Sequence, residues 1–142
     1  MTEIVAVDLG GTHARFALAD VEGGRVVMLH KEATLKTAEH ASFQLAWEEF
    51  GRIAGRTLPR ATAIAIAGPV DGDVIKLTNH PWIIRPALIK EKLGVDSYTL
   101  INDFGAVGHA VAQADDEHFL HLCGPEEDLP ESGTISIMGP GT

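Results

Sequence analysis

A glycine turn set between two apolar strands, directly after an aspartate, constrains this chain more than any other feature. Residues 5–18 read VAVDLGGTHARFAL: an apolar run reaches Asp8, Gly10-Gly11-Thr12 follows, and a second stretch then alternates apolar side chains. In a tight turn, glycines let backbone N–H groups converge on one anion, and the Thr12 hydroxyl adds a donor. An ordinary hairpin explains the same glycines, since Gly-Gly is a common hairpin dipeptide.

The carboxylate of Asp8 favours a nucleotide site over a plain hairpin. A carboxylate beside a phosphate is unfavourable unless a cation lies between them, and Mg²⁺ often binds one carboxylate together with nucleotide phosphates. We therefore expect Asp8 to hold a magnesium ion, directly or through water. Two other nucleotide motifs are absent: the sequence has no G-x-x-x-x-G-K-[ST] and no G-x-G-x-x-G that opens a helix.

Hydrophobic periodicity predicts an α/β fold with a mixed sheet. Three strands joined by short glycine turns come first, at residues 3–8, 13–19 and 25–31, and they suggest an antiparallel meander. Helical spacing of apolar residues follows at 39–55. Further strands are expected at 61–67, 73–77, 97–101 and 134–138, and further helices at 86–93 and 103–114.

Composition excludes several classes of protein. The chain has 142 residues, the size of one domain, and a formal charge of −9 from 20 acidic and 11 basic residues. A surface this negative is a poor partner for nucleic acid or anionic membrane, and no apolar run has transmembrane length. The N-terminus lacks the features of a signal peptide, and one cysteine, Cys123, fits a reducing compartment. We therefore expect a cytoplasmic protein.

Asn102-Asp103 is a second candidate site, because it follows the strand at 97–101 and opens the helix at 103–114. Either side chain could cap the N-terminus of that helix. The alternative is a ligand site, since ligands of α/β sheets bind at the carboxyl ends of strands. A zinc site at His118, His121 and Cys123 is not expected, because no fourth ligand stands at a usual spacing.

The string from Asp8 to Arg15 resembles the first phosphate motif of the hexokinase, actin and Hsp70 superfamily, in the form found in bacterial glucokinases. His13 stands where that family usually has Asn. Three further segments are similar to glucokinase motifs in the same order: residues 78–82 (Thr-Asn-His-Pro-Trp), 101–104 (Ile-Asn-Asp-Phe) and 139–142 (Gly-Pro-Gly-Thr). Ile-Asn-Asp-Phe resembles the non-ROK type, since ROK-type kinases typically show Glu-Asn-Asp.

The resemblance implies a fold, a chemistry and a set of site residues. The fold is a ribonuclease H-like mixed sheet with helices on both faces, as in a lobe of an actin-like ATPase. Asp103 is implied as the catalytic base for the 6-hydroxyl of glucose or a close hexose. The implied substrate-binding residues are Asn102, Asn79 and Asp103 itself. ATP and Mg²⁺ are the implied cofactors, held by Asp8, Gly10, Gly11, Thr12, Arg15, Gly139, Gly141 and Thr142.

Members of that family continue into a larger second domain, so we expect residues 1–142 to be the small N-terminal lobe alone, with little turnover by itself. The full-length enzyme is expected to be a homodimer. A non-catalytic sugar- or nucleotide-sensing domain and a different sugar kinase of the superfamily stay open as alternatives. Because a sensor needs neither magnesium nor a base, the presence of both Asp8 and Asp103 argues against it. Trp82 is expected in the core, and His80 in a loop without chemistry.

Overall fold

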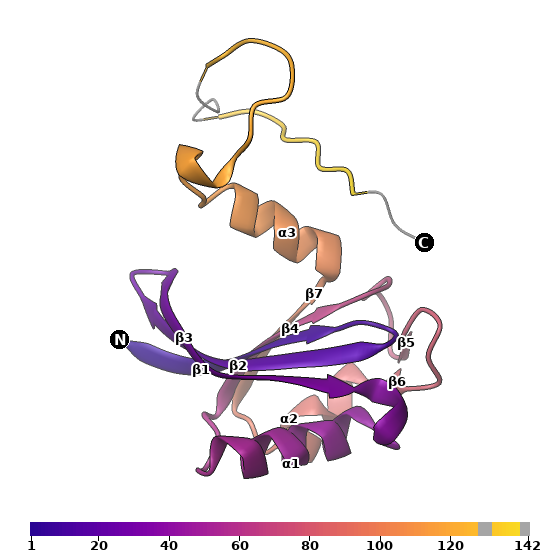
Figure 1. Ribbon diagram of the computed structural model, residues 1–142. Coiled ribbons are helices and arrows are strands. Elements are labelled where there is room, and N and C mark those ends of the chain that lie inside the picture. The colour runs from indigo at the N-terminus through magenta and orange to yellow at the C-terminus, as the bar shows by residue number, and fades with distance from the viewer. Residues whose placement is uncertain (128–131, 140–142) are drawn as a thin grey trace. The chain divides into compact units, whose positions relative to one another are not determined.

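The computed structural model describes residues 1–127 and 132–139 (Figure 1). Contacts divide the chain into two units, Met1–Asp103 and Phe104–Thr142, and each is described by itself. The first unit holds a five-stranded sheet in the order β3-β2-β1-β4-β7 and a two-stranded sheet of β5 and β6. The strands are β1 (Thr2–Leu9), β2 (His13–Glu22), β3 (Arg25–Lys36), β4 (Ala61–Ile66), β5 (Ile75–Lys76), β6 (Ile83–Ile84) and β7 (Ser97–Asn102).

The large sheet is mixed, as the sequence predicts. Strands β1, β2 and β3 form an antiparallel meander, whereas β4 pairs in parallel with both β1 and β7. Gly23 and Gly24 join β2 to β3, and both have positive φ, at 57° and 81°. A two-residue hairpin turn of this hand needs positive φ at both positions, which explains the Gly-Gly pair there.

Helix α1 (Phe43–Ala54) supplies most of the helical side of the core. The Ser42 hydroxyl accepts a hydrogen bond from the Leu45 N–H at 3.3 Å, so this cap starts the helix four residues later than predicted. The helix ends at Gly55, whose φ of 69° is left-handed. Residues Thr37–Glu39, expected to lead into the helix, form a separate 3₁₀ turn, η1.

The core lies between α1 and one face of the sheet. The Phe16 ring stacks on Phe50, with 5.1 Å between ring centroids, and on Phe43, at 6.3 Å. Alternation along the strands sends every second side chain to this face. The buried residues of the large sheet that follow this alternation are Val5, Val7, Leu9, Ala14, Phe16, Leu18, Thr62, Ile64 and Ile66.

A small subdomain of short elements completes the first unit. The helix predicted at 86–93 is split into a 3₁₀ turn, η2 (Pro86–Leu88), and α2 (Ile89–Leu93). The strand predicted at 73–77 is shorter, β5, and it pairs with β6, which the sequence did not indicate. Both α1 and α2 lie on the same side of the large sheet (Figure 1).

The second unit contains α3 (Asp103–Val111), whose first residue closes the first unit, and a 3₁₀ turn, η3 (Asp116–His118). The predicted strand at 134–138 is wrong, because residues 132–139 form none. A strand needs a ladder partner, and this segment lies along α3 instead. A methyl group built on Gly108 would lie 3.6 Å from Ile137, and one on Gly139 would lie 2.7 Å from the Phe104 ring.

No helix in residues 1–127 and 132–139 has the length and apolar character needed to cross a membrane.

Candidate functional site

Asp8 forms an ion pair with Arg15, its direct cross-strand partner on β2. The Arg15 guanidinium donates to the Asp8 carboxylate at 2.9 Å, and both side chains are about half exposed. Because Val7 and Leu9 are buried on the α1 face, alternation places Asp8 on the opposite face. The Arg15 guanidinium therefore offsets part of the repulsion between the Asp8 carboxylate and a bound phosphate, on which the magnesium prediction rests. The carboxylate stays accessible to solvent.

The glycine turn between β1 and β2 uses one of its backbone N–H groups to close the hairpin. The Gly10 N–H donates to the His13 carbonyl at 2.9 Å and closes the hairpin, so it does not serve the predicted anion site in this state. Among the residues that the structure describes, the N–H groups of Gly11 and Thr12 have no hydrogen-bond partner. The anion site that the geometry supports is thus narrower than predicted, with Gly11 and Thr12 as backbone donors.

Thr37 fixes this turn, and sequence reasoning missed it. Its hydroxyl donates to the Gly11 carbonyl at 2.9 Å, and its N–H donates to the Thr12 carbonyl at 3.0 Å. Thr37 is only 1% exposed, so both bonds are shielded from water. A threonine between a strand and a helix carries no sequence signal for such a contact, because its partners lie 25 and 26 residues earlier.

Gly11 has no room for a side chain. A methyl group built on Gly11 would lie 2.6 Å from the Thr78 carbonyl oxygen and 3.7 Å from the Asn79 Cβ atom. The turn and the 78–79 loop are therefore packed backbone to backbone. Asn79 is exposed beside the turn with a left-handed φ of 60°, so two separately predicted motifs meet here.

Ala67 and Gly68 join these segments to β7. The Ala67 N–H donates to the Leu9 carbonyl at 2.9 Å, and the Ala67 carbonyl accepts from the Thr78 N–H at 3.2 Å. The Asn102 amide donates to the Gly68 carbonyl at 2.9 Å, so one predicted sugar contact is already held in place. Gly68 was also missed, although the Gly68-Pro69 pair that breaks the chain after β4 was a usable signal.

The two predicted acids stand at the same edge of the sheet. Asp8, Ala65 and Ile101 occupy one row across β1, β4 and β7, and Asp103 comes two residues after Ile101 as the first residue of α3. Strands β1 and β7 are separated only by β4, which sets them about 10 Å apart. Asp103 is half-buried, and an acid in the first turn of a helix is favoured by the helix dipole.

The predicted second phosphate loop, at residues 139–142, falls outside the first unit. Gly139 belongs to the second unit, while Gly141 and Thr142 lie outside the described residues.

Trp82 is buried, as predicted, and its indole N–H donates to the His40 carbonyl at 2.9 Å. The His80 ring packs edge-on against Trp82, with 5.0 Å between centroids, and lies in a loop as predicted.

A cavity of about 60 Å³ lies between the start of α1 and α2, apart from these motifs. Its lining combines apolar side chains with Ser42, Gln44, Arg85 and Lys92, and none of the predicted site residues lines it. We place the candidate site at the strand ends rather than in this cavity, because polar groups converge there.

Known proteins similar to this chain share one description. A family model described as glucokinase matches residues 5–142. A glucokinase of Zymomonas mobilis is 64% identical over 140 residues, which is 99% of this chain and 43% of that protein. A glucokinase of Saccharophagus degradans is 34% identical over 142 residues, 100% of this chain and 44% of that protein. The chain therefore spans less than half the length of these curated relatives.

Solved structures agree with the sequence matches. A glucokinase from an Antarctic psychrotroph is similar with a TM-score of 0.73 and 27% identity, over 82% of this chain and 37% of that chain. A ROK hexokinase from Thermus thermophilus is similar with a TM-score of 0.56 and 25% identity, over 79% of this chain and 38% of that chain. The mixed sheet with its helices is thus the lobe fold of the sugar kinases.

Proposed function

This chain belongs to the glucokinase family, and we propose that it is the N-terminal lobe of an enzyme that phosphorylates glucose or a close hexose. The reaction would move the γ-phosphoryl group of ATP to the sugar 6-hydroxyl. One observation carries the proposal: the turn at 10–12, the loop at 78–79 and Asn102-Asp103 converge at the carboxyl ends of β1, β4 and β7. Ligands of α/β sheets bind at such edges.

The glycine turn would bind the phosphates of the nucleotide. Gly11 and Thr12 offer N–H donors on a backbone that Thr37 holds rigid, which is the form of site that suits an anion. The half-exposed Asp8 carboxylate is a hard oxygen ligand and fits Mg²⁺, which when bound would neutralise phosphate charge. Arg15 keeps the Asp8 carboxylate in position, and its guanidinium lies on the same face.

Asp103 would accept the proton of the sugar hydroxyl. A carboxylate with an ordinary pKa near 3.9 is far too weak to ionise an alcohol before the reaction begins. Phosphoryl transfer has a loose transition state, so the hydroxyl becomes acidic only as its bond to phosphorus forms. The base therefore acts late and mainly orients the oxygen, a task that suits a side chain fixed at the junction of β7 and α3.

The rest of the site would come from beyond this chain. Kinases that close two lobes over the substrate exclude water and assemble the site together, which one lobe cannot do. We therefore propose that residues 1–142 alone turn over little or no hexose. We further propose that the full-length enzyme is a cytoplasmic homodimer. Hexose-dependent ADP release by this chain at the rate of a complete kinase would contradict the lobe assignment.

The decisive experiment is Asp103→Asn in the full-length enzyme that carries this lobe. We expect kcat to fall by about 10²- to 10⁴-fold while the Kd for glucose, measured by calorimetry, stays within a few-fold. Asp115→Asn, at an exposed aspartate, is the matched control and should leave both values unchanged. A parent protein that binds glucose without releasing ADP would be a sensor, and preference for another phosphoryl acceptor would identify a different kinase.

A further inference from the structure

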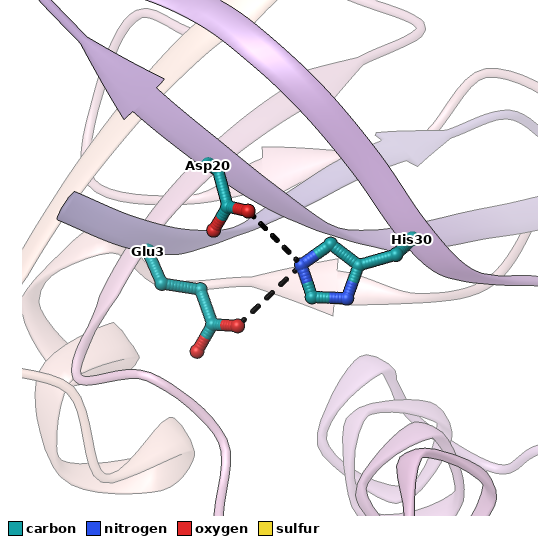
Figure 2. Close-up of side chains that lie close together, drawn as sticks. All are labelled: Glu3, Asp20 and His30. Atoms are coloured by element: carbon teal, nitrogen blue, oxygen red, sulfur yellow. Dashed lines mark ion pairs between the residues drawn. The ribbon is translucent and has the colours of Figure 1, made fainter. Parts of the chain in front are cut away.

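Three side chains that can bind metal meet on neighbouring strands of the meander (Figure 2). Glu3 of β1 and Asp20 of β2 are direct cross-strand partners, and His30 projects from β3. The His30 Nε2 atom lies 3.6 Å from a Glu3 oxygen and 3.6 Å from an Asp20 oxygen. At this distance neither contact is a hydrogen bond.

The pairing of Glu3 with Asp20 places two carboxylates side by side, and a cation between them would reduce their repulsion. Like charges directly opposite one another on a sheet are destabilising, and these two carboxylates are only about one-fifth exposed. Arg56 neutralises Glu3 through two hydrogen bonds, at 3.1 and 2.7 Å. Within the part of the chain that the structure describes, Asp20 has only His30 as a charged partner, and His30 is positive only when protonated.

We propose that Glu3, Asp20 and His30 bind one divalent transition-metal ion, such as Zn²⁺. Zinc holds nitrogen and oxygen ligands at about 2.0–2.2 Å, so two ligand atoms of a tetrahedral site stand about 3.4 Å apart. Two of the three separations here are already 3.6 Å, and all three ligand atoms lie within 4.8 Å of one another. Water would complete the coordination.

The donor set selects the class of metal. An imidazole nitrogen favours zinc, cobalt, nickel or copper, whereas Mg²⁺ prefers a set made entirely of oxygen. The three residues sit on three paired strands, so binding needs side-chain adjustment rather than backbone movement. This site is separate from Asp8, which lies near the other end of β1 and on its other face. The inference therefore does not rest on the proposed kinase function.

Arg56 allows a specific prediction about the affinity of the proposed site for metal. Because its guanidinium occupies both Glu3 oxygens, a metal must compete with it for that carboxylate. Removing the guanidinium with Arg56→Gln should therefore tighten metal binding several-fold. If the three residues formed only a network of ion pairs around His30, Arg56→Gln would weaken that network and no metal would bind.

The test is a titration of Zn²⁺, and of Co²⁺ as a spectroscopic probe, into the 142-residue chain at neutral pH. We expect one equivalent bound by calorimetry, a higher Tm with metal, and a visible Co²⁺ absorption band. His30→Asn and Asp20→Asn should each weaken binding more than about 10-fold. His109→Asn, at an exposed histidine of α3, is the matched control and should bind like the parent.

Two outcomes would overturn the site: no binding by the unmodified chain at millimolar metal, or unchanged binding after His30→Asn. If His30→Asn does not fold, NMR of the unmodified chain with substoichiometric Co²⁺ decides instead. The His30 ring signals must then shift or broaden before those of His118 and His121. Earlier effects at His118 or His121 would place the metal elsewhere and reject the proposal.

Discussion

The two units of this chain are both rich in apolar residues, yet among the described residues only those of the first unit form a core. Within residues 1–127 and 132–139, every buried apolar side chain lies between Val5 and Val95, in the first unit. Among the described residues of the second unit none is buried, and Leu120, Leu122 and Met138 are 83%, 84% and 95% exposed. Apolar content alone therefore does not produce a packed unit, which also needs a second layer of complementary shape.

The largest expected effect comes from removing a ring from the core of the first unit. Phe50 is fully buried and stacks on Phe16, so Phe50→Ala should lower the free energy of unfolding by about 3–5 kcal/mol. Leu122→Ala, in the second unit, should change it by less than about 0.5 kcal/mol. Urea unfolding followed by circular dichroism measures both. Similar losses for the two variants would show that the second unit has a core after all.

A smaller difference in stability is expected between alanine substitutions at two glycines, Gly11 in the first unit and Gly108 in the second. Gly11→Ala would place a methyl group 2.6 Å from the Thr78 carbonyl, so the turn and the 78–79 loop must move apart. We expect a loss of about 1–3 kcal/mol in unfolding free energy. Gly108→Ala, in α3, meets Ile137 at an ordinary 3.6 Å and should be neutral or slightly stabilising, since alanine favours a helix. Thermal unfolding of both variants checks the difference, and an equally destabilising Gly108→Ala would contradict it.

The start of α1 gives a third and smaller effect. Ser42→Ala removes the hydroxyl that accepts the Leu45 N–H, which should cost about 1 kcal/mol. Ser42→Asp keeps an acceptor at the same position and should recover most of the stability. Chemical unfolding of the pair distinguishes a cap from a general effect of substitution, because a loss with both variants would show that the hydroxyl is not acting as a cap.

The sequence predicted those parts of the fold that depend on local apolar patterning. The continuous apolar runs at 3–8 and 61–67 predict buried strands, and the observed strands β1 and β4 match within a residue or so. The strand at 134–138 failed although Ile135 and Ile137 alternate correctly, because alternation does not supply a ladder partner. Helix 39–55 was placed too early since Ser42, rather than the apolar pattern, decides where it begins.

The candidate site was predictable where a residue type carries its own chemistry. Asp8, the glycine turn and Asn102-Asp103 were identified, and β1, β4 and β7 bring them to one edge. Thr37 and Gly68 were missed because each acts through a backbone carbonyl of a distant segment. The Asp8–Arg15 pair was missed as well, since it depends on the cross-strand register of a three-residue turn.

The smallest effect tests whether surface charge adds to the stability of the first unit. Hydrogen bonds from Arg60 to Asp96, at 2.7 and 2.6 Å, hold the pKa of this exposed carboxylate below its ordinary value of 3.8. A carboxylate with a lowered pKa in the folded state stabilises the fold above the unfolded pKa, and the contribution disappears as the pH falls through the folded pKa.

Asp96→Asn should therefore be slightly less stable than the parent at neutral pH, and the difference should vanish in acid, below the ordinary pKa of 3.8. Added salt should shrink the difference at neutral pH, because exposed charges are screened. Thermal unfolding as a function of pH measures it, with Asp71→Asn as an exposed control in the same unit. A difference that persists in acid would assign the effect to packing rather than to the charge of Asp96.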